Sequence, residues 1–190
     1  VFSLHEMIDL FDIRDVNRKA SAFNTENLDW LNQHYMRSLP ADEVAEHLSW
    51  YFEKAGIDPH SGPALADLVS VQADRVKTLR EMTDQSRIFY EELDEFDAGA
   101  AKKHLRPVSE EPLRVIGSRL AELESWDPES LNDAVRIAAE ELEVGMGKIA
   151  QPLRVALTGT AVSPSIDKTL WLTGREGSLA RIQKALEYVL

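Results

Sequence analysis

Apolar side chains recur every three or four residues along almost the whole of this 190-residue chain, and this spacing is its strongest constraint on the fold. One such stripe is formed by Leu113, Ile116, Leu120 and Leu123. The period matches the α-helix and places the apolar groups on one helix face. We find no alternation of period two and no Asn-Gly or Asp-Gly hairpin turn, which are the signals of β-strands. The sequence therefore predicts an all-α fold made of helical bundle modules.

Capping residues indicate where several of these helices begin and end. Ser3 and Glu6 have the spacing of a capping box, and Asp127 before Pro128 combines a cap with proline at the first helical position. Gly174 follows the apolar pattern of residues 164–173 and predicts a helix end there. The apolar pattern of residues 65–82 predicts one long segment after Gly62-Pro63. Further predicted cap or stop residues are Asn24 or Thr25, and Gly56.

Two soft boundaries divide the predicted helices into modules. One is Leu39-Pro40, and the other is the acidic and then small stretch from Glu95 to Ala98. They give the segments 1–39, 40–95 and 96–190.

Composition excludes several classes of protein. The chain has no cysteine, which rules out disulfides and thiolate chemistry, and no apolar run near the ~20 residues of a membrane helix. The N-terminus does not have the pattern of a signal peptide, and we expect a cytoplasmic protein. A net charge of −12 argues against indiscriminate nucleic-acid binding, and we expect no DNA partner. Residues 145–190 hold six basic and only three acidic residues, which fits a local RNA contact and an ordinary solvated surface equally well.

No pattern of catalytic or metal-binding residues stands out. The histidines are scattered without the spacing of metal ligands, and there is no Gly-x-Ser-x-Gly motif. The segment 145–148 (GMGK) lacks the full phosphate-loop spacing and is interpreted as a helix connection whose lysine meets a backbone phosphate. We therefore expect no catalytic residue, no metal and no cofactor in these 190 residues.

Several short motifs together resemble one known family. Residues 151–159 (QPLRVALTG), followed by Ser163-Pro164, are similar to a signature near the end of bacterial glutamyl-tRNA synthetases. The chain departs from the family at Asn27, where lysine is usual. Other stretches that match in family order are residues 23–32 with Tyr35, Arg75 with Thr78-Leu79, residues 97–107, residues 140–148 and residues 172–186.

This resemblance covers essentially the whole chain and implies a function. It identifies residues 1–39 as the end of a stem-contact domain and 40–95 and 96–190 as two anticodon-binding helical modules of a class I synthetase. The catalytic half, which uses ATP and Mg²⁺ to attach glutamate to its tRNA, would precede Val1. The expectation is a non-catalytic, monomeric fragment whose partner is the glutamate tRNA.

The resemblance also implies which residues contact the anticodon. Arg75 matches an arginine that contacts the third anticodon base, a cytosine, and Arg154 matches a residue lining the anticodon pocket. If the family resemblance is set aside, Arg75 is expected to form an ion pair on the surface. Arg154 is then expected to form a salt bridge with a neighbouring acidic helix. Ser163, Pro164 and Ile166 match a loop and helix start around the second and third bases, although Ser-Pro alone is only a helix-start signal.

Further residues are assigned more loosely, and two rival functions stay open. We expect phosphate contacts from Lys148, Lys168 and Arg175. The four tryptophans are interpreted as core residues rather than base-stacking platforms: Trp30, Trp50, Trp126 and Trp171. The main rival is an acidic helical protein-interaction or scaffold domain without RNA binding, and a second rival, an unrecognised hydrolase, has no supporting residues.

Overall fold

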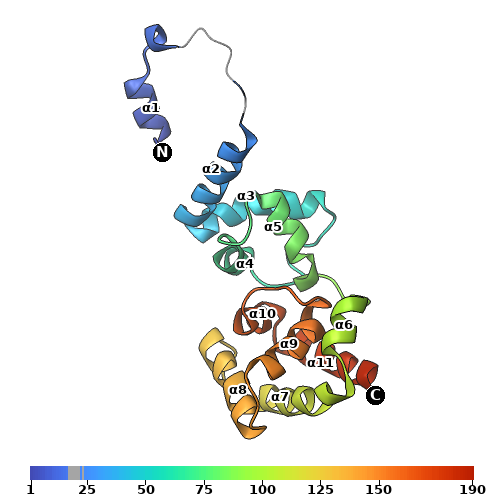
Figure 1. Ribbon diagram of the computed structural model, residues 1–190. Helices are drawn as coiled ribbons and strands as arrows, with labels where there is room; N and C mark the ends of the chain where they lie inside the picture. The colour runs from blue at the N-terminus through green and yellow to red at the C-terminus, as the bar shows by residue number, and fades with distance from the viewer. Residues whose placement is uncertain (17–21, 23) are drawn as a thin grey trace.

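The computed structural model describes residues 1–16, 22 and 24–190, and in these residues the regular structure is entirely helical (Figure 1). The predicted all-α class is confirmed. Phe23, which begins one of the motifs above, lies outside the described residues. The α-helices are α1 (Leu4–Leu10), α2 (Thr25–Ser38), α3 (Ala41–Lys54), α4 (Leu65–Gln72), α5 (Leu79–Ser86), α6 (Ala98–His104), α7 (Glu110–Glu122), α8 (Pro128–Glu141), α9 (Gly147–Thr158), α10 (Ile166–Thr173) and α11 (Arg175–Val189). Three short 3-10 helices join them: η1 (Ile13–Asp15), η2 (Arg87–Phe89) and η3 (Pro107–Ser109).

The predicted caps lie where the sequence placed them. Ser3 and Glu6 form the reciprocal capping box of α1. Asn24 accepts from the first amides of α2, and Asp127 accepts from the Ser130 amide at the start of α8. Gly174 ends α10 with a φ of 74°, a positive value that glycine adopts without the strain that a Cβ would cause.

The segment predicted to be one long run is broken in two. Residues 73–78 form a turn between α4 and α5, and the Thr78 hydroxyl accepts from the Glu81 amide to begin α5. The Gln33 side chain of α2 donates to the carbonyl of Val76 at 3.0 Å and holds this turn from outside. The break places Arg75 on an exposed turn instead of a helix.

Buried apolar residues form two clusters, which we call the first core and the second core. The first core joins α2, α3, α4, α5 and η2, with Leu48, Phe52 and Leu68 at its centre. The second core joins α6 to α11, with Leu120 and Leu153 at its centre. We call the corresponding groups of helices, α2–η2 and α6–α11, the first and second bundles. The module boundaries at 39/40 and 95/96 stay predictions.

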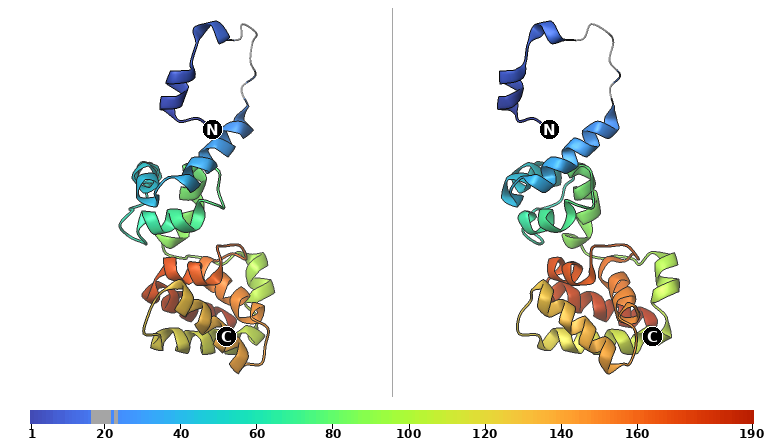
Figure 2. Two further views of the ribbon diagram at one scale, coloured as in Figure 1. Left: turned by 90° about the vertical axis from the view of Figure 1, so that its left-hand side faces the viewer. Right: turned by 60° about the vertical axis from the view of Figure 1, so that its left-hand side comes forward.

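The two bundles are stacked end to end, and α10 lies where they meet (Figure 2). Leu172 of α10 is buried in the first core although its helix belongs to the second bundle, and Trp171 packs against both cores. Arg181 of α11 donates to the carbonyls of Ile88 and Glu91 at 2.7 and 2.8 Å, which ties α11 to the end of the first bundle. The contact between the bundles is therefore both apolar and polar.

Helix α1 stands apart from both bundles in Figure 1. The apolar side chains of Met7 and Ile8, and that of the following Phe11, are exposed in the described part of the chain. None of the helices that the structure describes is long and apolar enough to cross a membrane.

Candidate nucleic-acid interface

Two arginines from different bundles meet at one carbonyl oxygen. Arg75, on the turn after α4, donates through Nη2 to the carbonyl of Ser163 at 3.0 Å. Arg154 of α9 donates through Nη1 to the same oxygen at 3.1 Å. The family resemblance predicts that all three residues belong to one site, and the structure brings them together across the junction of the bundles.

Neither arginine forms the ion pair that was the alternative reading. Within the described residues, no carboxylate lies within salt-bridge distance of Arg75 or Arg154. Arg154 is half-buried and also donates to the Ser163 hydroxyl and the Pro164 carbonyl. Burial, and secondly the positive charge of Arg75, hold the pKa of Arg154 below its usual value. Two cations held only by neutral oxygens leave positive potential that an electron-rich ligand can satisfy.

The loop that carries Ser163 is held by local geometry. Gly159 ends α9 with a φ of 73°, and a Cβ there would lie 2.8 Å from Cδ1 of Leu93. The Thr158 hydroxyl donates back to the Arg154 carbonyl at 2.9 Å. The Ser163 hydroxyl lies 2.9 Å from that of Thr169 on α10, a buried residue that the sequence did not single out. The Ser163 carbonyl is thus fixed before any ligand arrives.

The residues after Ser163 can contribute backbone groups to the site, because the side chains of Pro164 and Ile166 are buried. Pro164 is buried, and Ile166 is 6% exposed with its side chain in the second core. Helix α10 begins after Ser165 without a side-chain cap, so its first amides are not bound by the preceding side chain. A contact from Ile166 to a base would therefore come from its backbone amide.

A cavity of about 460 Å³ opens beside this loop, between the bundles. Arg75, Thr158, Ser163 and Pro164 form part of its lining. Gln72, which the sequence did not single out, also lines it; its Oε1 is buried and has no hydrogen-bond partner among the described residues. The lining also includes the carboxylates Asp84, Glu91 and Glu92. Donors beside acceptors suit a neutral polar surface, such as the edge of a base, better than a lone phosphate.

The three residues predicted to contact phosphate have different surroundings. Lys148 and Lys168 are exposed. Arg175 instead donates to the carbonyls of Ala121 and Leu123 at the end of α7, and its guanidinium lies 5.3 Å from the ring centroid of Trp126. These contacts give Arg175 a structural role. A phosphate could contact this side chain only through the donors that the two carbonyls leave free.

The tryptophans divide evenly between core and surface. Trp171 packs between the cores, and Trp126 is partly buried, with its Nε1 donating to the Leu170 carbonyl at 3.2 Å. Trp30 and Trp50 are 59% and 54% exposed, so the prediction that they are core residues is wrong. Both side chains lie on exposed helix surfaces, Trp30 on α2 and Trp50 on α3, and Nζ of Lys54 lies 4.6 Å from the Trp50 ring centroid.

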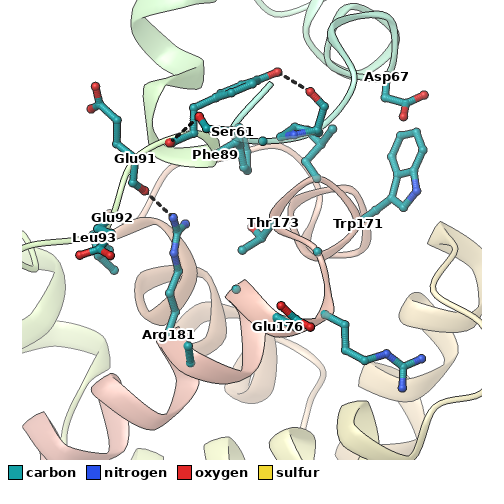
Figure 3. Close-up of a pocket in the computed structure, with 18 of the residues that line it drawn as sticks. Ser61, Asp67, Phe89, Glu91, Glu92, Leu93, Trp171, Thr173, Glu176 and Arg181 are labelled. Atoms are coloured by element: carbon teal, nitrogen blue, oxygen red, sulfur yellow. Dashed lines mark hydrogen bonds between the residues drawn. The ribbon is translucent and has the colours of Figure 1, made fainter. Parts of the chain in front are cut away.

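A larger cavity, about 830 Å³, lies farther along the junction of the bundles (Figure 3). Figure 3 shows Arg181 reaching from α11 toward the backbone at Glu91, with Asp67 and Glu176 also in the lining. Burial holds the pKa of Arg181 below its usual value. The Arg181 guanidinium is bound to three carbonyls, so its role is to join the bundles. Because the lining also carries carboxylates, this cavity is poorly suited to binding an anion. No cluster of three or more metal-binding side chains occurs within residues 1–16, 22 and 24–190.

Comparisons with known proteins relate this chain to one family and one fold. A family model described as an anticodon binding domain matches residues 43–186. A solved glutamate tRNA ligase from Elizabethkingia meningosepticum has a TM-score of 0.86 and 22% identity over 100% of this chain, and 37% of that chain is covered. A glutamate-tRNA synthetase from Elizabethkingia anophelis has a TM-score of 0.79 and 23% identity over 98% of this chain and 36% of its own. At such identities the likeness is one of fold, and the chain spans little more than a third of either structure.

Proposed function

The chain belongs to the anticodon-binding domain family, and from this premise we propose that it binds the anticodon loop of glutamate tRNA at the junction of its two bundles. The observation that carries the proposal is the convergence of Arg75 and Arg154 on the Ser163 carbonyl. Sequence-specific proteins read RNA where bases are unpaired and their edges are free, as in an anticodon loop. The cavity beside Ser163 offers donors and acceptors of the kind that such edges require.

Arg75 is the residue we propose to read the third anticodon base. A guanidinium has five N–H donors in a fixed plane, and the Ser163 carbonyl engages Nη2 alone. The remaining donors match the carbonyl and ring-nitrogen acceptors on the pairing edge of cytosine. Guanine presents donors in place of the ring-nitrogen acceptor at that edge, so an arginine held in this position disfavours it. This is how the chain would prefer the anticodon CUC of glutamate tRNA over CUG of glutamine tRNA.

Arg154 and the loop it holds complete the proposed site. Its contacts to Ser163 and Pro164 fix the loop, and helix α10 begins two residues after Pro164 without a side-chain cap. We propose that the first amides of α10, including that of Ile166, contact the edge of the second or third base. Backbone donors at a helix start suit this role because they are aligned and their positions do not depend on side-chain rotamers.

The proposal extends to the protein of which this chain would form part. Two solved structures with this fold are a glutamate tRNA ligase and a glutamate-tRNA synthetase. We propose that this chain is the tRNA-reading part of such an enzyme, monomeric, cytoplasmic and without a DNA partner. ATP and Mg²⁺ would be used by the catalytic part, so the chain alone would not charge tRNA.

The test is a binding titration of the chain with glutamate tRNA bearing CUC and with the same tRNA changed to CUG. We expect tighter binding to CUC by about ten- to a hundredfold, the range of ~1–3 kcal/mol for one good base contact. In Arg75→Gln this preference should disappear. Arg136→Gln, which removes an exposed cation from α8, should keep it.

Each other outcome has a distinct meaning. Equal binding of both tRNAs by the unaltered chain would contradict anticodon reading and leave a module that grips only the RNA backbone. No binding to either tRNA at low salt would favour the protein-interaction domain. Charging of tRNA by this chain with ATP, magnesium and glutamate would contradict its non-catalytic role.

A further inference from the structure

A third cavity, of about 690 Å³, lies in the second bundle, outside the site described above. Its walls are the end of α6 with η3, the start of α7, and the turn that joins α8 to α9. The α8–α9 turn lies at the end of the second bundle that points away from the first bundle (Figures 1 and 2). The cavity is therefore formed by two segments that are separate in the sequence, residues 103–112 and residues 144–152.

The cavity is cationic in an acidic protein. Lys103, Arg106 and Lys148 line it, and its lining among the described residues contains no carboxylate. All three side chains are exposed, and none is within salt-bridge distance of an acidic group that the structure describes. The nearest acidic residue along η3 and α7, Glu110, pairs with Arg114 instead. In a chain of net charge −12, such a group attracts an anion from solution.

Apolar surface lies between these cations. Val108 is 72% exposed, and Val144, Pro112 and Pro152 are also in the lining. A free inorganic anion would gain nothing from contact with this apolar surface. A ligand that contains both a phosphate and a flat ring would, because the ring can cover the apolar wall while the phosphate contacts the cations.

The wall that carries Arg106 is held in place by backbone contacts. The buried Ser109 hydroxyl donates to the His104 carbonyl at 2.6 Å and accepts from the Arg106 amide at 3.3 Å. His104 itself lines the cavity. Partial burial, followed by the charges of Lys103 and Arg106, holds the pKa of His104 below its usual value. An anion in the cavity would offset both charges and raise the pKa of His104, so this pKa would show whether an anion is bound.

Helix α9 connects this cavity to the anticodon site. Gln151 lines the cavity and lies three residues from both Lys148 and Arg154, so it is a neighbour of each on the helix surface. Lys148 and Arg154 are separated by about 9 Å along the helix axis, at 1.5 Å per residue. A short stretch of single-stranded RNA spans that distance.

We propose that this cavity binds a nucleotide that flanks the anticodon, with its phosphate against Lys103, Arg106 and Lys148 and its ring over Val108. This inference rests on the proposed function, because that function is what identifies the RNA as glutamate tRNA. It adds a second contact point, one that grips every tRNA alike and contributes affinity without selecting the anticodon.

The first experiment neutralises the cavity and measures tRNA binding at several salt concentrations. In the triple variant Lys103→Gln, Arg106→Gln, Lys148→Gln we expect affinity at low salt to fall at least tenfold for CUC and CUG tRNAs alike. The slope of log affinity against log salt should fall by about 0.7, the contribution of one single-stranded phosphate contact. The matched control is Arg114→Gln, Arg119→Gln, Arg136→Gln, which removes three cations of the same bundle that do not line the cavity.

The two proposals fail in different ways in this experiment. An unchanged affinity and slope in the cavity variant, with the CUC preference intact, would overturn the nucleotide site alone. A chain that never distinguishes CUC from CUG would contradict anticodon reading, while a drop confined to the cavity variant would still support the site. Equal losses in the cavity and control variants would overturn the site, because total charge would then explain the binding.

The second experiment identifies the source of the nucleotide. Titrating His104 by NMR, we expect an anticodon stem-loop to raise its pKa, and cytidine monophosphate at equal concentration to leave it almost unchanged. A rise with cytidine monophosphate and none with the stem-loop would overturn the tRNA assignment in favour of a free nucleotide. His104 unmoved by either ligand, while the stem-loop binds elsewhere, would overturn the site itself.

Discussion

The guanidinium groups of Arg75 and Arg154 donate to one carbonyl oxygen, that of Ser163, at 3.0 and 3.1 Å. Arg75 lies 88 residues before Ser163 and belongs to the other bundle. One neutral acceptor therefore holds two like charges at the junction of the bundles. The position of each arginine depends on the loop that carries Ser163 and on the contact between the bundles.

Replacing Arg154 by lysine should weaken the loop although the charge is retained. An ammonium cannot reproduce the planar donors that reach the Ser163 and Pro164 oxygens. We expect the free energy of unfolding, measured in urea, to fall by about 1–3 kcal/mol. Amide exchange in residues 160–169 should become faster. Arg136→Lys on the surface of α8 is the control, and an unchanged exchange pattern in Arg154→Lys would show that the loop does not depend on this side chain.

Gly159 should not tolerate alanine. Its φ of 73° is unfavourable for a residue with a Cβ, and that Cβ would lie 2.8 Å from the Leu93 side chain and 3.0 Å from the Glu95 carbonyl oxygen. We expect Gly159→Ala to lower the free energy of unfolding by more than about 1 kcal/mol. Gly145→Ala, where a Cβ meets nothing within 4 Å, should change it by less than that. Similar thermal midpoints for the two variants would contradict this account.

Removing the Arg181 guanidinium should loosen the two bundles relative to each other. Arg181→Met keeps most of the buried stem but leaves the carbonyls of Leu157, Ile88 and Glu91 without their donor. We expect cleavage by chymotrypsin within residues 88–96, which contain Phe89, Tyr90 and Leu93, to become faster, and small-angle scattering to report a more extended particle. Arg136→Met controls for the loss of a cation. A variant with the scattering curve of the unaltered chain would mean that the apolar contact at Leu172 alone orients the bundles.

His104 should make the fold less stable as the pH falls. Its pKa is lower in the folded chain than the usual 6.5, because of burial and the nearby Lys103 and Arg106. The unfolded chain therefore binds more protons in this range, and stability present above pH 6.5 is lost as pH falls through the folded pKa. In urea titrations between pH 7.5 and about 5, His104→Gln should show a smaller decline than the unaltered chain. An identical decline would assign the effect to other groups.

Much of the fold follows from local patterns, because its signals lie within one helix. The caps at Ser3, Asn24 and Asp127 and the stop at Gly174 need only neighbouring residues, and each lies where the sequence predicts it. The break between α4 and α5 could not be predicted in this way. The Val76 carbonyl is held by Gln33, which is 43 residues away in the sequence.

The candidate site shows the same division between local and distant information. Motif similarity brought Arg75, Arg154 and Ser163 to attention, and the structure places them together. The partners of the basic side chains were not predictable, because backbone carbonyls carry no residue-specific signal. Arg175 and Arg181 are bound by such carbonyls, and the grouping of Lys103 and Arg106 with Lys148 depends on how α6 and η3 pack against α9. Only the fold reveals which cations are already engaged and which face solvent.

The burial of Leu172 in the first core affects the order in which the chain can fold. A ribosome synthesises α3, α4 and α5 well before α10, so these helices emerge while one member of their core does not yet exist. Until α10 arrives, helix α4 lacks a helix that it contacts in the finished protein. Contacts between residues so far apart in sequence form late, because a long loop must close first. The first bundle should therefore gain its final stability only when the last two helices have left the ribosome, during an interval in which a chaperone could bind it.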